Sequence, residues 1–301
     1  MLPPNVPSDE RGEIGSVATL GEATARTQGA VERVERLQLH SEPSAANTEG
    51  VVANRSGQVL LPHTLLKGDH FPGCQNLKLK PLIDGAPNFR KIQGLPVYGV
   101  AIPTVVGLRN ILSQLGITAK NQRRLVWINL REEPLIYVNG SPYVVRESDK
   151  PFANLEYSGI DAERVVEMEE RLKADVLAEA SLYDGSILVA HEDDQFQVVE
   201  DWEPVTEVDV QTPLEVYEEL ARDGFNVHYL RVPITDEKAP MGDDFEVLMR
   251  NAWELDASDS IIFNCQMGRG RTTTGMVIAC CILLRKAQGH LAPPPVCTGY
   301  L

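Results

Sequence analysis

The sequence predicts an α/β fold in which helices flank a central, mostly parallel sheet. From residue 186 onward, short apolar runs alternate with helical patterns in the order strand, helix, strand, helix, strand. Helical crossovers between parallel strands produce this order. The hydrophobic fraction of 43% and the charged fraction of 24% are typical of globular proteins, and 301 residues suffice for one sizeable core.

Composition divides the chain into three parts. Residues 1–50 are rich in Gly, Ser, Ala, Glu and Arg and show little apolar periodicity, so we expect a disordered leader. Residues 51–290 carry globular patterning and form the predicted folded domain. Residues 291–301, which include a run of prolines, are predicted to be a short irregular tail.

The first elements of the domain are predicted to be short strands and one helix. Strand-like runs bounded by Gly and Pro lie within residues 57–71 and 95–103. Residues 104–116 have helical spacing and end in a glycine. Residues 124–130 are mostly apolar, which is typical of a buried strand.

A hairpin and a long helix follow. Residues 135–145 predict a hairpin whose Asn139-Gly140 pair suits a type I′ turn. Residues 161–183 give the strongest helical pattern of the chain, with Asp161 placed to cap it. The predicted core face of this helix carries Val165, Met168, Leu172, Val176 and Leu177.

The second half supplies the alternation that predicts the sheet. Strands are predicted over residues 186–191, 226–233 and 260–264, and helices over residues 213–224 and 244–255. Sites in such sheets lie beyond the carboxyl ends of the strands. The sequence that follows the last of these strands is therefore the first place to look for chemistry.

That sequence, CQMGRGRTTTG, predicts a phosphate-binding loop with a nucleophilic thiol. Gly268 and Gly270 let the backbone turn tightly so that its N–H groups converge, and a helix that begins near Thr272 adds partial positive charge. Arg271 can grip two phosphoryl oxygens with its planar guanidinium. The same positive field favours the thiolate of Cys265, which predicts attack on phosphorus and a phosphocysteine intermediate.

The predicted phosphate-binding residues are Gln266, Met267, Gly268, Arg269, Gly270 and Arg271. Thr272 joins Cys265 and Arg271 among the predicted catalytic residues. The alternative is a structural cysteine at the end of a buried strand.

The stretch YLRVPITDEKAP, residues 229–240, supplies a candidate acid. Phosphate transfer to the thiol needs a group that protonates the leaving oxygen. If the strand before this stretch neighbours the strand that ends at Asn264, the loop overhangs the cysteine. Asp236 is then the general acid, and later the base that activates water. A solvated carboxylate in a turn is the alternative.

The loop CQMGRGRT resembles the phosphate loop of cysteine-dependent phosphatases of the protein tyrosine phosphatase superfamily. Three further stretches, GAPNFRKIQGLPVYGVAIPTVVGLRNIL, WINLREEPLIYVNGSPYVVR and RVPITDEKAP, are similar to the paladin family, whose members resemble the tyrosine-phosphatase-like phytases. The resemblance covers residues 51–285. It implies a phosphatase fold with Cys265 as nucleophile, Arg271 as phosphate clamp and Asp236 as general acid. Such domains normally continue with further helices, so we expect this one to be truncated at its C-terminus.

The flanking residues favour inositol phosphates or phosphoinositides as substrates. Tyrosine-specific members of the superfamily usually have histidine before the nucleophile, where this chain has Asn264. Arg269 adds a second cation to the loop, as in relatives that act on inositol phosphates. Arg131 and Lys238 are predicted to extend the positive rim. Two alternatives stay open: a catalytically weak phosphoinositide-binding scaffold, and a protein tyrosine or dual-specificity phosphatase.

Charge and cysteine usage exclude other classes. The net charge of -15 argues against a nucleic-acid partner. Residues 276–284 form the longest apolar run, too short to span a bilayer, although a phosphoinositide substrate would imply transient contact with a membrane surface. Five cysteines without a CxxC pair favour a reducing compartment, and we expect a cytosolic protein. No metal-ligand spacing is present, so neither a metal nor a cofactor is predicted, and the oligomeric state is not readable.

Overall fold

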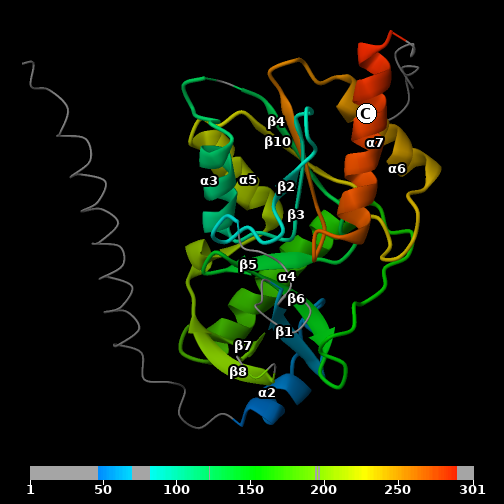
Figure 1. The fold of residues 1–301 in the computed structure, drawn as a ribbon. Helices are drawn as coiled ribbons and strands as arrows, with labels where there is room; N and C mark the ends of the chain where they lie inside the picture. Colours follow the sequence, from blue (N-terminus) through cyan, green and yellow to red (C-terminus); the bar gives the residue numbers. More distant parts are fainter. Residues whose placement is uncertain (1–46, 70–81, 122, 194, 196, 290–301) are drawn as a thin grey trace, which may run out of the picture. The chain divides into compact units, whose positions relative to one another are not determined.

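The structure is a computed structural model, and it describes residues 47–69, 82–121, 123–193, 195 and 197–289 (Figure 1). The predicted leader lies outside the described residues except for residues 47–50, where the first described helix, α2 (Thr48–Ala53), begins. The predicted tail also lies outside them. The described strands form two sheets, and each has its own helices.

The first sheet has the strand order β10-β4-β11-β3-β2. Its strands are β10 (Val227–Arg231), β4 (Leu125–Asn129), β11 (Ser260–Asn264), β3 (Val97–Val100) and β2 (Arg90–Lys91). The first four run parallel, and β2 pairs antiparallel with β3 at the edge. The prediction of a mostly parallel sheet flanked by helices is confirmed for this part of the chain.

Helices cover both faces of the parallel sheet because successive side chains of a buried strand point to opposite sides. On β4, Leu125 and Trp127 pack in one core cluster with residues of α3 (Val105–Gln114) and α5 (Pro213–Arg222). The alternating residues Val126 and Ile128 of β4 pack in a second cluster with residues of α6 and α7. The bounds of these last two helices are Gly242–Trp253 for α6 and Gly270–Ala287 for α7. The result is a three-layer arrangement in which the four parallel strands end at the same edge (Figure 1).

The second sheet is mixed, with the strand order β8-β7-β1-β6-β5-β9. Its strands are β8 (Val198–Pro204), β7 (Ser186–Glu192), β1 (Thr64–Gly68), β6 (Ser141–Glu147), β5 (Leu135–Val138) and β9 (Val210–Gln211). The sequence alternation placed β7 in the parallel sheet, and this was wrong. β7 pairs with β8 as a hairpin on one edge and with β1 on the other. Neither edge is therefore left to pair with a strand of the parallel sheet.

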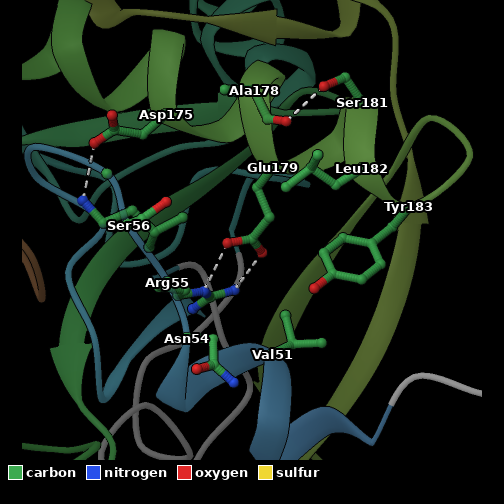
Figure 2. A pocket seen from close by; sticks show the side chains of 12 residues that line it. Val51, Asn54, Arg55, Ser56, Asp175, Ala178, Glu179, Ser181, Leu182 and Tyr183 are labelled. Atoms are coloured by element: carbon green, nitrogen blue, oxygen red, sulfur yellow. Dashed lines mark hydrogen bonds and ion pairs between the residues drawn. The ribbon is translucent and has the colours of Figure 1, made fainter.

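The long helix α4 (Ala162–Leu182) packs its apolar face on the second sheet, and Arg55, just after α2, forms an ion pair with Glu179 of α4. Figure 2 shows the carboxylate of Glu179 facing the guanidinium of Arg55, with contacts of 2.9 and 3.0 Å. Arg55 also donates to the carbonyl oxygens of Thr64 and Leu188, on two strands of the sheet. A cavity of about 340 Å³ lies beside this pair. All three guanidinium nitrogens of Arg55 donate hydrogen bonds within the fold.

Local signals predicted the elements well. Asp161 caps α4 by accepting a hydrogen bond from the backbone N–H of Arg164 at 2.7 Å. The β5–β6 hairpin turns through Asn139 (φ 50°) and Gly140 (φ 77°), the left-handed pair that a type I′ turn requires. The predicted core face of α4 omits two residues that are buried, Glu169 and Ala180, and includes Met168 and Leu177, which are only partly buried.

Glu169 is buried because it bonds to both sheets. Its carboxylate accepts from the guanidinium of Arg231 on β10 and, at 3.1 Å, from the backbone N–H of Leu135 on β5. Burial raises the pKa of Glu169 to about 7, although Arg231 and the Leu135 N–H oppose the rise. Burial lowers the pKa of Arg231, but Glu169 more than offsets this and raises the pKa overall. This pair joins the second sheet to the first.

The pH dependence of stability tests this pair. A carboxyl whose pKa is raised by folding stabilises the fold most below its unfolded pKa, and the contribution is lost as pH rises through the folded pKa. We therefore expect the free energy of unfolding of the wild type, relative to Glu169→Gln, to fall by roughly 3 kcal/mol between about pH 4.5 and 7. Urea unfolding of both proteins across this range measures it. A difference that is constant, or that grows with pH, would mean that Arg231 outweighs burial.

Candidate active site

The predicted phosphate loop lies where the parallel strands end. Residue Cys265 follows β11 directly, and the backbone reaches α7 at Gly270. The thiol is 3% exposed, and it accepts a hydrogen bond from the hydroxyl of Thr272, with 3.1 Å between Oγ1 and Sγ. Thr272 lies in the first turn of α7, so the N-terminus of this helix and one of its hydroxyls both face the sulfur.

The conformation of the loop depends on Gly268. Its φ is +67°, and a Cβ there would lie 2.5 Å from the backbone nitrogen of Ala101, just past the end of β3. The side chain of Asn88 holds the same stretch, because its Nδ2 donates to the carbonyl oxygens of Met267 and Gly268, both at 3.0 Å. Asn88 lies in the stretch GAPNFRK, which resembles the paladin family, but the sequence alone did not predict a role for it.

Arg271 and Asp236 are in contact, as their predicted roles require. The Arg271 side chain is almost fully buried, its Nη1 donates to the carbonyl oxygen of Ile234 at 3.2 Å, and its Nε lies 3.2 Å from Oδ1 of Asp236. The carboxylate is partly open to solvent, with 43% of the side chain exposed. The predicted clamp and the predicted acid therefore lie together at the phosphate loop.

The path of the acid loop differs from the prediction. Strand β10 does not neighbour β11, because β4 lies between them. The chain crosses the end of β4 instead: the backbone N–H of Val232 donates to Asn129 at 2.9 Å, and that of Ile234 donates to Leu130 at 3.3 Å. These two bonds carry the loop across one strand width and bring Asp236 to Arg271.

The structure places Arg131 inside the protein and not on a positive rim. The side chain is fully buried, and its guanidinium contacts the carboxylates of Asp69 and Glu133. Burial lowers the pKa of Arg131, but these carboxylates more than offset it, with a further contribution from Cys265, so the pKa is raised. Gln266 of the phosphate loop donates to Asp69 at 3.1 Å. Arg131 thus supports the loop from within the protein.

Sequence reasoning missed Arg90, a half-buried cation at the site. Its guanidinium donates to the carbonyl oxygen of Asn88 at 3.2 Å and to the hydroxyl of Thr273 at 2.9 Å. Burial lowers the pKa of Arg90, and the charge of Cys265 partly offsets this. Arg90 lies in the stretch PNFR, but a single arginine there has no spacing that marks it as a binding residue.

Arg269 and Lys238, the other predicted substrate-binding residues, are exposed. Arg269 precedes the first turn of α7, and Lys238 lies on the acid loop. Within the described part of the chain neither side chain forms an ion pair. Asn264, by contrast, is buried, where it accepts from the indole N–H of Trp127 at 2.9 Å and donates to Asn129 at 3.3 Å.

The described residues hold no cluster of three or more His, Cys, Asp or Glu side chains that would suit a metal ion. No helix in the described ranges is long and apolar enough to cross a membrane.

A substitution at Gly268 tests the loop geometry. We expect Gly268→Ala to lower the free energy of unfolding by about 3 kcal/mol, because it combines a left-handed backbone with a backbone clash. Gly270→Ala is the matched control: a Cβ there meets no atom within 4 Å, so its effect should stay within about 1 kcal/mol. Urea unfolding measures both, and similar values for the two variants would contradict the requirement for glycine at position 268.

Comparison with known proteins agrees with the sequence resemblance. The family model PTPlike_phytase, described as "Inositol hexakisphosphate", matches residues 128–283, more than half of the chain. Paladin from Homo sapiens is 29% identical over 245 residues, which cover 80% of this chain and 25% of that protein. Paladin from Xenopus tropicalis is 28% identical over 249 residues, covering 82% and 26%. The chain thus spans about a quarter of the length of these paladins.

Two solved structures are also similar. A PTP-like phytase from Bdellovibrio bacteriovorus has a TM-score of 0.43 and 23% identity, with 64% of this chain and 61% of that chain covered. The tandemly repeated phytase of Mitsuokella multacida has a TM-score of 0.48 and 20% identity, covering 75% and 37%. The match of the family model decides the assignment: the chain belongs to the PTP-like phytase family, within the protein tyrosine phosphatase-like superfamily of phosphatases.

Proposed function

We propose that this chain is a cysteine-dependent phosphatase that hydrolyses phosphomonoesters of inositol phosphates or phosphoinositides. The observation that carries the proposal is the contact between Arg271 and Asp236 at the loop that holds Cys265. Nucleophile, anion clamp and proton donor are then present together, as phosphate transfer to a thiol requires. The assignment needs no metal or cofactor.

The proposed reaction has two steps. In the first, Sγ of Cys265 attacks phosphorus in line with the leaving oxygen, the P–O bond breaks, and protonated Asp236 gives its proton to that oxygen. In the second, the Asp236 carboxylate takes a proton from water, the water oxygen bonds to phosphorus, and the P–S bond breaks. Arg271 and the loop N–H groups hold the phosphoryl oxygens throughout. The hydroxyl of Thr272 stabilises the departing thiolate.

The substrate class rests on local charge. The chain carries a net charge of -15, yet Arg269 and Lys238 lie exposed near the site without an ion pair among the described residues. Cations that bind no carboxylate of their own are suited to the further phosphates of a multiply phosphorylated ring. The matching family model is described by inositol hexakisphosphate, which belongs to this class. We also propose a reducing, cytosolic environment, since oxidation of Cys265 would remove the nucleophile.

A substrate panel tests the proposal. Purified protein should release phosphate from soluble inositol phosphates or short-chain phosphoinositides, and Cys265→Ser should lower the rate by more than about 1000-fold because it removes the nucleophile. Phosphate release followed by colorimetry, together with trapping of the phosphocysteine, measures this. Tight binding without turnover would favour the scaffold alternative. Release from phosphotyrosine peptides alone would overturn the substrate class.

Arg269 tests the role of local charge. We expect Arg269→Ala to raise KM for a multiply phosphorylated inositol by about tenfold, through loss of one charge-assisted contact, and to change KM for a singly phosphorylated substrate little. Steady-state kinetics on both substrates measures this. The control is Arg164→Ala on α4, which removes an exposed arginine that pairs with Glu167. An equal change in KM for both substrates would contradict the assignment.

A further inference from the structure

Asn154 lies between the acid loop and the second sheet and bonds to both. It belongs to the segment that connects β6 to α4. Its Nδ2 donates to Oδ2 of Asp236 at 2.8 Å, and its Oδ1 accepts from Nη2 of Arg146 at 3.0 Å. A flipped amide would put its oxygen against a carboxylate and its NH₂ against a guanidinium. The two neighbours therefore fix the orientation of the amide.

The side of Asn154 that faces the second sheet is rigidly anchored. Arg146 belongs to β6, is 2% exposed, and also donates to the buried carboxylate of Glu133. Glu133 in turn contacts Arg131, the buried arginine that supports the phosphate loop. Buried charges that bond to each other hold their geometry closely, because separating them leaves a charge uncompensated.

The side that faces the acid loop is loosely packed. The side chain of Asp236 is partly exposed, and the next residue, Glu237, has a φ of 58°, a left-handed conformation that costs about 1–2 kcal/mol for a residue other than glycine. A cavity of about 240 Å³ separates Lys238 and its neighbours from Gly159. Residues 237–239 are exposed, so the position of this part of the loop depends on individual hydrogen bonds.

We propose that Asn154 is a positioning residue for Asp236, and this inference rests on the proposed function. Asn154 holds the carboxylate of the acid beside Arg271 and couples the acid loop to the buried charges of the second sheet. Oδ2 of Asp236 accepts the amide N–H of Asn154, while Oδ1 accepts the backbone N–H of Glu237 and lies 3.2 Å from Nε of Arg271. The second sheet thus contributes to protonation of the leaving group through one amide.

Kinetics on two substrates distinguishes a role of Asn154 in positioning Asp236 from a general loss of structure at the site. We expect Asn154→Ala to lower kcat/KM about 10- to 100-fold on an inositol phosphate, whose leaving alkoxide needs a proton. On 2,4-dinitrophenyl phosphate, whose phenolate departs without a proton, kcat/KM should stay within about twofold, because it covers only the steps up to departure of the phenolate and Asp236 acts as a base only afterwards. In an Asp236→Asn background, Asn154→Ala should have no further effect on the inositol phosphate. An equal loss on both substrates, or no loss on either, would overturn the inference.

Hydrogen exchange gives a readout that does not need activity. Backbone amides of residues 234–239 should exchange about tenfold faster in Asn154→Ala than in the wild type, since the loop loses its hydrogen bond to Asn154 and thereby its link to the second sheet. The control Asn110→Ala, which removes a surface amide that donates to Asp84, should leave these rates unchanged. If the wild type releases no phosphate from either substrate, the proposed function fails and exchange alone decides the role of Asn154. Unchanged amide exchange in the acid loop of Asn154→Ala would then refute the proposed role of Asn154.

Discussion

The buried pairing of Arg131 with Asp69 and Glu133 is the interaction on which the site depends. Arg131 follows β4 of the parallel sheet, whereas Asp69 follows β1 and Glu133 precedes β5, both of the second sheet. Because Gln266 of the phosphate loop bonds to Asp69, the two sheets and the loop meet at one guanidinium. Charges buried to this extent are stable only when all partners stay in place, so the cluster fixes the relative position of the sheets.

Local patterns in the sequence predicted most of the elements and singled out the residues of the proposed site. A thiol at the end of a buried strand, glycines after it and an arginine before a helix each have a local physical cause, and the structure brings Cys265, Arg271 and Thr272 together. The match to the family model confirms the family that these motifs indicated. Asp236 was identified by its place after a strand, and it does lie at Arg271.

Contacts between segments that lie far apart in the sequence could not be predicted from such local patterns. No local signal says that β7 pairs with β8 and β1 and not with the parallel strands, or that β4 separates β10 from β11. Arg131 and Glu169 are charged residues beside apolar runs, which is the pattern of an exposed edge as well as of a buried ion pair. Their burial follows from partners that lie far away in the sequence. For the same reason, the proposed role of Asn154 could not be predicted from the sequence.

The contact between Arg271 and Asp236 has a consequence for selectivity. Without a bound ester, the clamp is already neutralised by a carboxylate, so an arriving ester must compete with an internal anion. In the proposed reaction, a phosphate monoester competes for Arg271 with two negative charges, whereas a sulfate ester of the same shape has one. The carboxylate of Asp236 therefore discriminates between esters by their charge, because the ester must displace it from Arg271 before any bond is broken.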